Sequence, residues 1–540
     1  IRSIHYRKVR ETMRKIPGYE NTNSEVPDKK YWLYGLMIVF FALAFRLFEL
    51  GERVLHHDES IHASFTLKLL EHGEYSYDPA YHGPFLFHST AAVFHFLGIT
   101  DTTSRLVPVL FGVATILLLF LLRKELGKNG VLWSMFLLAF SPSMVYFSRF
   151  FRNDMIIIFC TLAAVTGTFR YLDSIHSLKR YPYLILVASS LAVAVSSKEN
   201  AYIILAVFGA YAGLGFLYWI CSDWKKENMG LKKTLRSKTS ALLPYLPEII
   251  LSGALSVLII MFFYSSAFRY DVSLFSIVER AFNHWMEMHR IERIGGPFYY
   301  YIPILLRYEI PVVLFGAAGF FYFLFNRVRN KGQNYSFFLF LCYWALTSLL
   351  LYSYIQEKVP WLVVHIVLPF GLLAGAFLGE VFSKKNKDGQ PKKPDYPGKI
   401  RALLTVILVL TLLVFISQCI SVNYYRSMED EELITYTQAS PDIRILMEKI
   451  EGFNESPDTL RIYVIDQYQL YWPLPWYLRD YERAAYSSKP PSSSKYDAII
   501  VPISCDMYRE LSEEEYSSYN FTLRPGRDFT LYYNNKLEQQ

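Results

Sequence analysis

The chain has 540 residues, of which 52% are apolar, 17% are aromatic and only 19% are charged, and its formal net charge is +7. The apolar residues form long blocks, which excludes an ordinary soluble domain and indicates a polytopic membrane protein. Its basic residues fall mainly in short segments between these blocks, where they set orientation in the membrane. The positive charge therefore does not predict a nucleic-acid partner.

Eleven apolar blocks are long enough to cross a hydrocarbon core of about 30 Å, which needs roughly 17 to 25 helical residues. The predicted fold class is a polytopic α-helical membrane protein with about eleven transmembrane helices, followed by a small α/β domain. We expect the spans at 32–50, 105–122, 130–147, 154–172, 182–197, 200–220, 247–266, 308–326, 335–355, 360–380 and 402–422.

Lys and Arg predict the orientation of these spans, because short cytoplasmic loops are enriched in both. They gather in the N-terminal arm, residues 1–31, and in every second segment between spans. We therefore expect this arm to be cytoplasmic and residues 32–422 to form a multi-pass domain in the cell membrane. Loops 51–104 and 267–307 then lie outside, and so does everything after residue 422.

Residues 423–540 carry 12 basic and 20 acidic side chains, a net charge of −8, against +15 for the rest of the chain. Such a shift marks a domain boundary, so we expect an extracytoplasmic domain here. Strands that alternate with helices predict a small α/β fold. The expected elements are helices at 442–451 and 507–515 and strands at 460–466, 497–502 and 530–534.

The most conspicuous polar stretch, residues 56–59, follows the first span and reads His-His-Asp-Glu. Unpaired charge beside lipid is costly, so Asp58 and Glu59 are a candidate reaction centre. His57, Asp58 and His62 recur at helical spacing and could hold a divalent cation, although the pattern selects no particular metal. The alternative is that the histidines of this loop are packed or solvated at the membrane interface.

Further charged and aromatic residues lie in other segments that the topology places on the same outer side as Asp58. Their simplest interpretation is that long basic side chains extend to the membrane surface. Their shared side instead favours one functional surface. The residues are His82, Arg149, Arg152, Asp154, Lys198, His289, Arg293, Lys358, Trp361, Trp472 and Trp476.

Carboxylates and cations gathered at an outer membrane surface suit a reaction whose leaving group is a lipid phosphate. The cations would stabilise the charge that grows on the departing phosphate. An aspartate would act as general base on the attacking hydroxyl, and a carboxylate near cations stays ionised at neutral pH, as this role requires.

Several of these motifs, in their order along the chain, resemble the GT-C superfamily of polyprenyl-phosphate-sugar-dependent glycosyltransferases. They are Asp58-Glu59 after the first span, Ser148-Arg149 with Asp154, Lys198, and Lys358-Val-Pro-Trp361. The chain looks closest to the protein O-mannosyltransferase and aminoarabinose-transferase clan. His57-Asp-Glu-Ser, Tyr81-His-Gly-Pro, His289-Arg-Ile-Glu-Arg-Ile-Gly-Gly-Pro and Trp472-Pro-Leu-Pro-Trp resemble an archaeal and bacterial family of flippase-activity-associated membrane proteins.

The resemblance implies a catalytic base at Asp58 with Glu59 beside it, a second acid at Asp154 and a phosphate contact at Lys358. One departure is His82, because aminoarabinose transferases carry a lysine before the proline pair of this loop. A contact from His82 to phosphate would depend on pH. The expected phosphate-binding set is Lys358, Arg152, Arg149, His82 and Lys198, and the expected substrate or acceptor set is His289, Arg293, Trp361, Trp472 and Trp476.

We therefore expect an inverting glycosyltransferase that takes a sugar from a polyprenyl- or dolichyl-phosphate carrier. The acceptor would be a hydroxyl of a glycan, lipid or protein at the outer membrane face. The alternative is a lipid-linked oligosaccharide flippase, or a protein that assists one. A flippase needs ionisable residues deep in its spans, whereas here they cluster at one face, which favours the enzyme.

Overall fold

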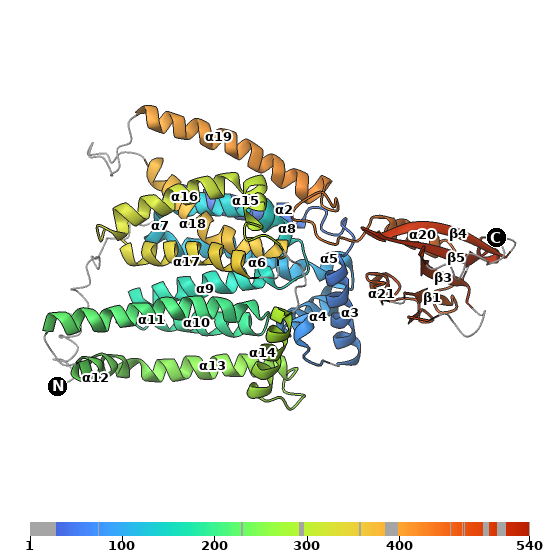
Figure 1. Ribbon diagram of the computed structural model, residues 1–540, viewed down its shortest axis with the longest axis horizontal. Helices are drawn as coiled ribbons and strands as arrows, with labels where there is room; N and C mark the ends of the chain where they lie inside the picture. The colour runs from blue at the N-terminus through green and yellow to red at the C-terminus, as the bar shows by residue number, and fades with distance from the viewer. Residues whose placement is uncertain are drawn as a thin grey trace.

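The structure, a computed structural model, describes residues 29–73, 75–227, 231–290, 296–355, 358–383, 398–453, 455–466, 468, 470–489, 496–504 and 515–538. Most of these residues are helical. Long helices lie side by side in a bundle, and a small sheet domain lies beyond one end of it (Figure 1).

Within these ranges, nine helical runs are long and apolar enough to cross a membrane, which confirms the class of polytopic helical protein. The predicted number of eleven is not confirmed. Predicted spans 105–122 and 130–147 fall largely on α6 and α7, which form one continuous run, Leu106–Ala139, although Gly127, with a φ of 73°, separates two helices. Both ends of this run lie at the same end of the bundle, because Arg105 donates to the Leu50 carbonyl and Arg46 donates to the Ala139 carbonyl. The predicted span at 182–197 falls on α10 (Arg180–Val195), a shorter apolar helix.

The nine runs are built from these elements: α2 (Lys29–Leu47), α6 (Leu106–Leu118) with α7 (Arg123–Ala139), α9 (Asp154–Asp173), α11 (Asn200–Glu227), α12 (Leu231–Leu242) with α13 (Leu246–Tyr264), α16 (Ile310–Phe323), α17 (Tyr335–Tyr354), α18 (Val364–Val381) and α19 (Gly398–Ile420).

Helix α18 is the centre of the bundle, and 94% of its span is buried. Glycines let it approach α7 closely. A Cβ added to Gly375 would lie 2.0 Å from the Ser134 Oγ, and one added to Gly379 would lie 2.4 Å from the Gly130 backbone nitrogen. Close backbone approach of this kind is how membrane helices gain packing contacts without a hydrophobic driving force.

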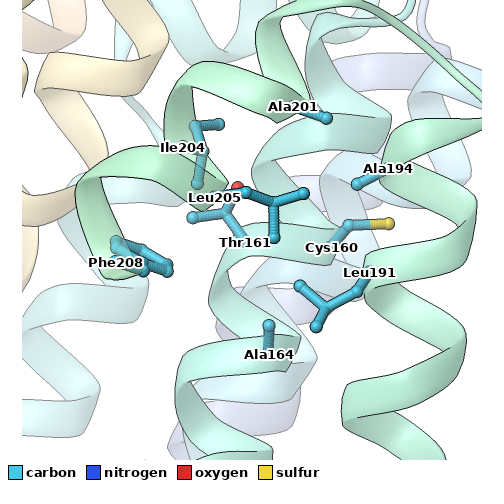
Figure 2. A pocket seen from close by; sticks show the side chains of 9 residues that line it. All are labelled: Cys160, Thr161, Ala164, Leu191, Ala194, Ala201, Ile204, Leu205 and Phe208. Atoms are coloured by element: carbon cyan, nitrogen blue, oxygen red, sulfur yellow. The ribbon is translucent and has the colours of Figure 1, made fainter. Parts of the chain in front are cut away.

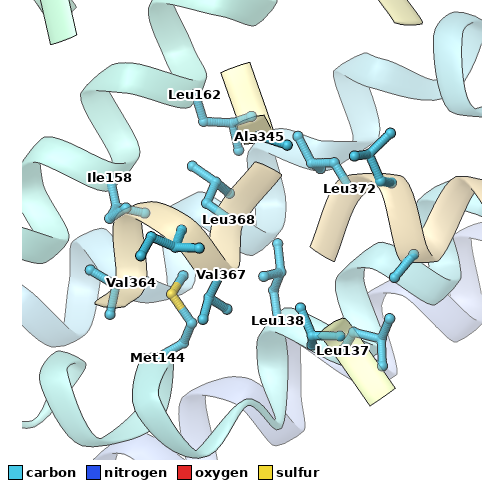
Figure 3. Close-up of a cluster of buried hydrophobic side chains, with 14 of the residues drawn as sticks. Leu137, Leu138, Met144, Ile158, Leu162, Ala345, Val364, Val367, Leu368 and Leu372 are labelled. Atoms are coloured by element: carbon cyan, nitrogen blue, oxygen red, sulfur yellow. The ribbon is translucent and has the colours of Figure 1, made fainter. Parts of the chain in front are cut away.

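Apolar side chains from α7, α8 (Pro142–Ser148), α9, α17 and α18 fill the space between these helices (Figure 3). Leu137, Leu138, Ile158 and Leu368 are completely buried there. By contrast, the spans of α11 and of the α12–α13 run are each only 6% buried, and their exposed leucines suit contact with lipid.

Short helices cover the end of the bundle that faces the sheet domain (Figure 1). They are α3 (His57–His72), α4 (Phe85–Leu97), α5 (Asp101–Ser104), α14 (Leu274–Arg290) and α15 (Tyr301–Tyr308). Helix α3 begins with a capping box: the His56 ring accepts from the Asp58 N–H at 2.9 Å, and Glu59 accepts from the His56 N–H at 2.9 Å. This start holds Asp58 in the first turn.

The C-terminal domain contains a five-stranded sheet in the order β2-β1-β3-β5-β4. Strand β1 pairs parallel with β2 and β3, while β5 pairs antiparallel with β3 and β4. The bounds are β1 (Ile462–Ile465), β2 (Ala485–Ser487), β3 (Ala498–Pro502), β4 (Tyr516–Arg524) and β5 (Arg527–Asn534), with helices α20 (Asp442–Glu451) and α21 (Leu474–Tyr477).

The predicted helix 442–451 and strands 460–466, 497–502 and 530–534 correspond to α20, β1, β3 and β5. Strands β2 and β4 were not predicted. The predicted helix 507–515 lies outside the described residues, except for its last position.

The sheet domain is attached to the bundle end through α21. The Trp476 Nε1–H and the Tyr477 hydroxyl each donate to Asp101 of α5 at 2.7 Å, and the Leu55 N–H donates to the Tyr477 hydroxyl at 2.8 Å. Trp476 is completely buried in this contact. It therefore does not form the acceptor surface that the sequence predicted, because no substrate can reach it here.

Candidate active site

Asp58 is the most accessible acid of a charged cluster at this end of the bundle, and its side chain is 30% exposed. It forms an ion pair with Arg152, which comes from the loop before α9. Burial opposes ionisation of Asp58, but the Arg152 guanidinium and neighbouring imidazoles lower its pKa well below the usual range. Asp58 is therefore a carboxylate at neutral pH.

Arg152 joins the two acids of the cluster. Besides its contact with Asp58, its Nη2 lies 3.1 Å from the His82 Nε2 and its Nε lies 3.9 Å from an oxygen of Asp154. Its guanidinium lies over the Trp361 ring, 4.1 Å from the centroid, which adds a cation–π contact. Arg152 is thus held from three sides between the two carboxylates.

Asp154 is the first residue of α9, where the helix dipole stabilises negative charge. The Lys198 Nζ donates to its two oxygens at 2.9 and 3.2 Å. The His365 Nε2 lies 3.7 Å from the nearer of these oxygens. The side chain of Asp154 is only 2% exposed, so the pair with Lys198 compensates a buried charge.

Sequence reasoning missed His365 and the residues that position it. The Asn200 Nδ2 lies 3.0 Å from the His365 Nε2, and the Tyr352 hydroxyl donates to the Asn200 Oδ1 at 3.0 Å. The Tyr352 ring also stacks on the imidazole at 5.3 Å. His365 lies within an apolar span and Tyr352 near the end of one, and buried polar residues in such spans are the signal that could have revealed them.

His82 connects this network to the loop between α10 and α11. Its Nδ1 lies 2.8 Å from the Glu199 Oε2. The turn that carries His82 lies directly on this loop, because the Gly83 N–H donates to the Ser197 carbonyl at 3.0 Å. A Cβ at Gly83 would lie 2.3 Å from the Ser196 carbonyl oxygen, so only glycine fits. Burial opposes ionisation of Glu199, and the His82 imidazole lowers its pKa.

Glu59 is completely buried, and both its oxygens are occupied. Arg105 donates to them at 2.8 and 2.7 Å, and the Phe151 N–H donates at 2.6 Å. Burial opposes ionisation, but the Arg105 charge brings the pKa of Glu59 to about 2. This geometry contradicts the predicted catalytic role, since substrate cannot reach the carboxylate. Glu59 instead fixes the loop that carries Arg152 against the start of α3.

Arg149 does not join the cluster either, contrary to the prediction that it binds phosphate. Its guanidinium donates to the carbonyls of Phe45 at 3.2 Å, Arg46 at 3.4 Å and Glu49 at 2.9 Å, and it lies over the Tyr424 ring. These contacts occupy its donors. Arg149 therefore closes the end of α2.

The Lys358 ammonium also points toward backbone carbonyls. Its Nζ donates to the carbonyls of Ser353 and Ile355 at 2.5 Å and of Tyr352 at 3.3 Å, at the end of α17. Lys358 is 2% exposed, and burial lowers its pKa. In this arrangement it is not available to the phosphate that the sequence predicted it to bind.

The predicted metal ligands do not converge. The His57 Nδ1 lies 2.6 Å from the Arg524 Nη1, the His62 Nδ1 lies 3.3 Å from the Phe151 carbonyl oxygen, and Asp58 faces Arg152. No group of three or more His, Cys, Asp or Glu side chains suited to a metal occurs among the described residues. In this arrangement the three residues do not fit a divalent cation.

Arg524 of β4 brings the sheet domain to the edge of the cluster through its contact with His57. Burial and the Arg524 charge lower the pKa of His57 to about 4, so it is neutral at pH 7. Trp472, predicted as an acceptor contact, is partly buried, and its backbone hydrogen-bonds to the His57 ring, so its predicted role stays a prediction. The side chain of His289 and all of Arg293 fall outside the described structure, so these two predictions stay untested.

Comparison of the sequence with curated proteins finds no match. Residues 73–270 match the family model described as dolichyl-phosphate-mannose-protein mannosyltransferase. Among solved structures, ArnT from Cupriavidus metallidurans, bound to undecaprenyl phosphate, superposes with a TM-score of 0.58 at 16% identity, covering 95% of this chain and all of ArnT.

The chain has the GT-C fold. The oligosaccharyltransferase AglB from Archaeoglobus fulgidus, in complex with an inhibitory peptide and a dolichol-phosphate, is a second solved structure with a similar fold. It superposes with a TM-score of 0.53 at 13% identity, covering 91% of this chain and 73% of AglB. The predicted GT-C fold is confirmed, while the narrower family remains a prediction.

A cavity of about 10 Å³ between α9, α10 and α11 lies away from this cluster (Figure 2). Its lining includes Cys160, Leu191 and Phe208 and is almost entirely apolar. A space of this size has room for about one water molecule and offers few polar partners, so it is a packing defect between spans.

Proposed function

We propose that this GT-C chain transfers a sugar from a polyprenyl- or dolichyl-phosphate carrier to a hydroxyl acceptor, with Asp58 as general base. The observation that carries the proposal is the position of Arg152, which is held between the partly exposed Asp58 and the buried Asp154 beside Lys198. One accessible carboxylate next to two fixed cations is what proton removal and phosphate departure require together.

In the proposed reaction, Asp58 accepts the proton of the acceptor hydroxyl as its oxygen attacks the anomeric carbon. The bond from this carbon to the carrier phosphate breaks, and the phosphate leaves with the electron pair. Arg152 and Lys198 stabilise the negative charge on the phosphate oxygens. Because the attack is a single displacement from the side opposite the phosphate, the anomeric configuration inverts.

Arg152 couples donor binding to base strength in this scheme. Its ion pair holds the pKa of Asp58 low, which makes the free carboxylate a weak base. The donor phosphate shares the guanidinium and so weakens its ion pair with Asp58. The pKa of Asp58 therefore rises when the donor sugar binds. Asp154 and His82 keep Arg152 in place during this exchange.

Two findings support the lipid carrier. ArnT and AglB share the fold and were solved with undecaprenyl phosphate and a dolichol-phosphate, respectively. The basic segments of the sequence favour a cytoplasmic N-terminus, and we therefore propose that Asp58 and the sheet domain lie outside the cell membrane. The acceptor is then a glycan, lipid or protein that approaches from outside.

The distribution of buried charge favours transfer over translocation. Within the described spans, Arg170 pairs with Glu125, Arg180 with Glu248, and Arg327 with Glu380. Each pair lies at helix ends in the sequence rather than at mid-span. A flippase would need a polar path through the middle of the bundle.

The test is the release of polyprenyl phosphate by the purified full chain, supplied with a polyprenyl-phosphate sugar and an acceptor. We expect Asp58→Asn to lower turnover by a factor of about 10² to 10⁴, because the base is lost. Glu52→Gln is the matched control, since Glu52 is an exposed acid of the same loop that pairs with Arg444. Full turnover by Asp58→Asn would exclude the assignment of Asp58 as base.

A further inference from the structure

A second cavity, of about 330 Å³, lies between the segment before His82, the end of α13 and the start of α14. We call it the tyrosine pocket because four tyrosines line it together with small, polar and aliphatic residues. Its lining consists of Tyr75, Ser76, Tyr77, Tyr264, Tyr270, Asp271, Val272, Ser276, Ile277 and Arg280.

Aromatic rings form the inner wall of the tyrosine pocket. Tyr77 and Tyr264 are 8% and 2% exposed and meet edge to face at 4.8 Å. Tyr270 lies further out and donates from its hydroxyl to the Gly73 carbonyl at 3.1 Å. The Tyr75 hydroxyl is buried without a hydrogen-bond partner among the described residues.

Polar side chains stand at the rim of the tyrosine pocket. Asp271 and Arg280 are exposed, Ser276 is partly exposed, and the Arg280 Nη1 lies 3.5 Å from the Tyr77 carbonyl oxygen. One acid and one base give the lining no net charge. Together they offer carboxylate acceptors and guanidinium donors to a neutral ligand that carries several hydroxyls.

The tyrosine pocket shares a wall with the candidate active site. The Tyr77 hydroxyl donates to the Glu199 Oε1 at 3.4 Å, and the other Glu199 oxygen lies 2.8 Å from the His82 ring. His82 in turn contacts Arg152, the partner of Asp58. A ligand in the pocket is thus linked to Asp58 through the contacts of Tyr77, Glu199, His82 and Arg152.

We propose that the tyrosine pocket binds a pyranose ring of the substrate. Its volume lies at the lower end of the range of small-molecule sites, roughly 300 to 1,000 Å³, and suits one or two sugar rings. The C–H face of a pyranose packs on tyrosine rings, while its hydroxyls bond to charged and hydroxyl groups at the rim. The choice of a sugar among neutral ligands rests on the proposed glycosyl transfer.

Other ligand classes match the lining less well. A phosphate would need an excess of positive charge, whereas Asp271 offsets Arg280. A lipid tail would cover Asp271 and Ser276 without hydrogen bonds, which costs free energy for each group.

Saturation-transfer NMR on the full chain in detergent tests this proposal, with methyl pyranosides as probes. We expect transfer from protein to the pyranose ring protons of at least one probe. Ser276→Trp fills the pocket and should weaken binding at least tenfold. Val278→Trp is the matched control, because it adds the same ring to α14 at an exposed position outside the lining. Equal binding by both variants would overturn the proposal.

A milder pair of variants keeps the test valid if Ser276→Trp does not fold. Asp271→Asn preserves the shape of an exposed rim residue and should weaken pyranoside binding about tenfold, as expected for a lost bond to a charged group. Glu279→Gln removes an exposed acid of α14 outside the lining and should leave binding unchanged. Unchanged binding by Asp271→Asn would contradict the proposal.

Competition identifies the source of the sugar ring. If the pocket holds the donor sugar, a polyprenyl-phosphate sugar displaces the methyl pyranosides. If it holds a sugar of the acceptor, both bind together. Either result supports a pyranose site.

The pocket proposal and the proposed reaction are tested by different measurements, so one can be contradicted without the other. Asp58→Asn should keep pyranoside binding although it loses transfer. Loss of binding in pocket variants that keep their thermal stability therefore tests the pocket alone.

Discussion

At the scale of single residues, the structure separates acids that the sequence could not distinguish. Asp58 and Glu59 are adjacent, yet the first turn of α3 points one at Arg152 and the other at Arg105. The sequence predicted one functional surface from several outer segments, and the structure brings Asp58 and His82 of the first outer loop together with Arg152, Asp154 and Lys198. The positions of Arg149 and Lys358 could not be predicted, because their partners are mostly backbone carbonyls brought together by tertiary packing, and that of Glu59 depends on Arg105 from a distant segment.

Arg152→Gln should lower turnover by about 10² to 10³, the usual cost of removing one charge-stabilising donor. It should also move the acid limb of the pH–rate profile of kcat/KM to higher pH. The native pKa of Asp58 lies below its usual range, and loss of the guanidinium raises it. A profile measured between pH 3 and pH 8 checks the shift, and an unmoved acid limb would contradict the coupling.

Glu59→Gln should lower the melting temperature. Breaking a buried ion pair lowers the free energy of unfolding by about 3 to 5 kcal/mol. The folded pKa of Glu59 is about 2, below its unfolded value of 4.5. Its contribution to stability is therefore complete above pH 4.5 and is lost as pH falls toward 2. Thermal unfolding at pH 7 measures the loss, with Asp58→Asn as the comparison. Equal melting temperatures for Glu59→Gln and the native chain would contradict this role.

At the scale of elements, apolar length predicted where the spans lie but not their number. The connection that the sequence placed between spans 105–122 and 130–147 is short and has non-helical backbone at Gly127, so α6 and α7 form one continuous run. The sequence also missed β4, which alternates polar and apolar residues around Asn520. Strand β4 pairs with β5 across the short turn at Pro525-Gly526. This Pro-Gly turn before a predicted strand is the sequence signal that could have revealed β4.

Gly375→Ala tests the packing of α18 against α7. The added Cβ would lie 2.5 Å from the Ser134 backbone nitrogen, which cannot rotate away, so we expect a loss of about 1 to 3 kcal/mol. Gly253→Ala in α13 is the control, since nothing lies within 4 Å of its added Cβ. Thermal unfolding in detergent should show a lower midpoint for the first variant alone. Similar midpoints for both would contradict the close approach.

At the scale of the whole molecule, the candidate site depends on contact between the bundle end and the sheet domain. Arg524 reaches His57, and the Gln438 Nε2 donates to the Val54 carbonyl at 2.8 Å, next to the start of α3. The change in net charge near residue 423 predicted a separate domain. Composition could not predict this attachment, because it depends on a few long-range hydrogen bonds.

Asp101→Ala should loosen the sheet domain, because Trp476 and Tyr477 would keep buried donors without acceptors. We expect faster hydrogen exchange in α21 and around residue 55, measured by mass spectrometry, and a several-fold loss of turnover. Unchanged exchange in α21 would show that Asp101 does not hold the two parts together.

The most direct test of the account is a structure of the full chain with bound polyprenyl phosphate. We predict phosphate oxygens about 3 Å from the Arg152 guanidinium and the Lys198 ammonium, with Asp58 facing the space where the sugar attaches. A phosphate bound beside Lys358 or Arg149, away from Arg152 and Lys198, would contradict the proposed centre.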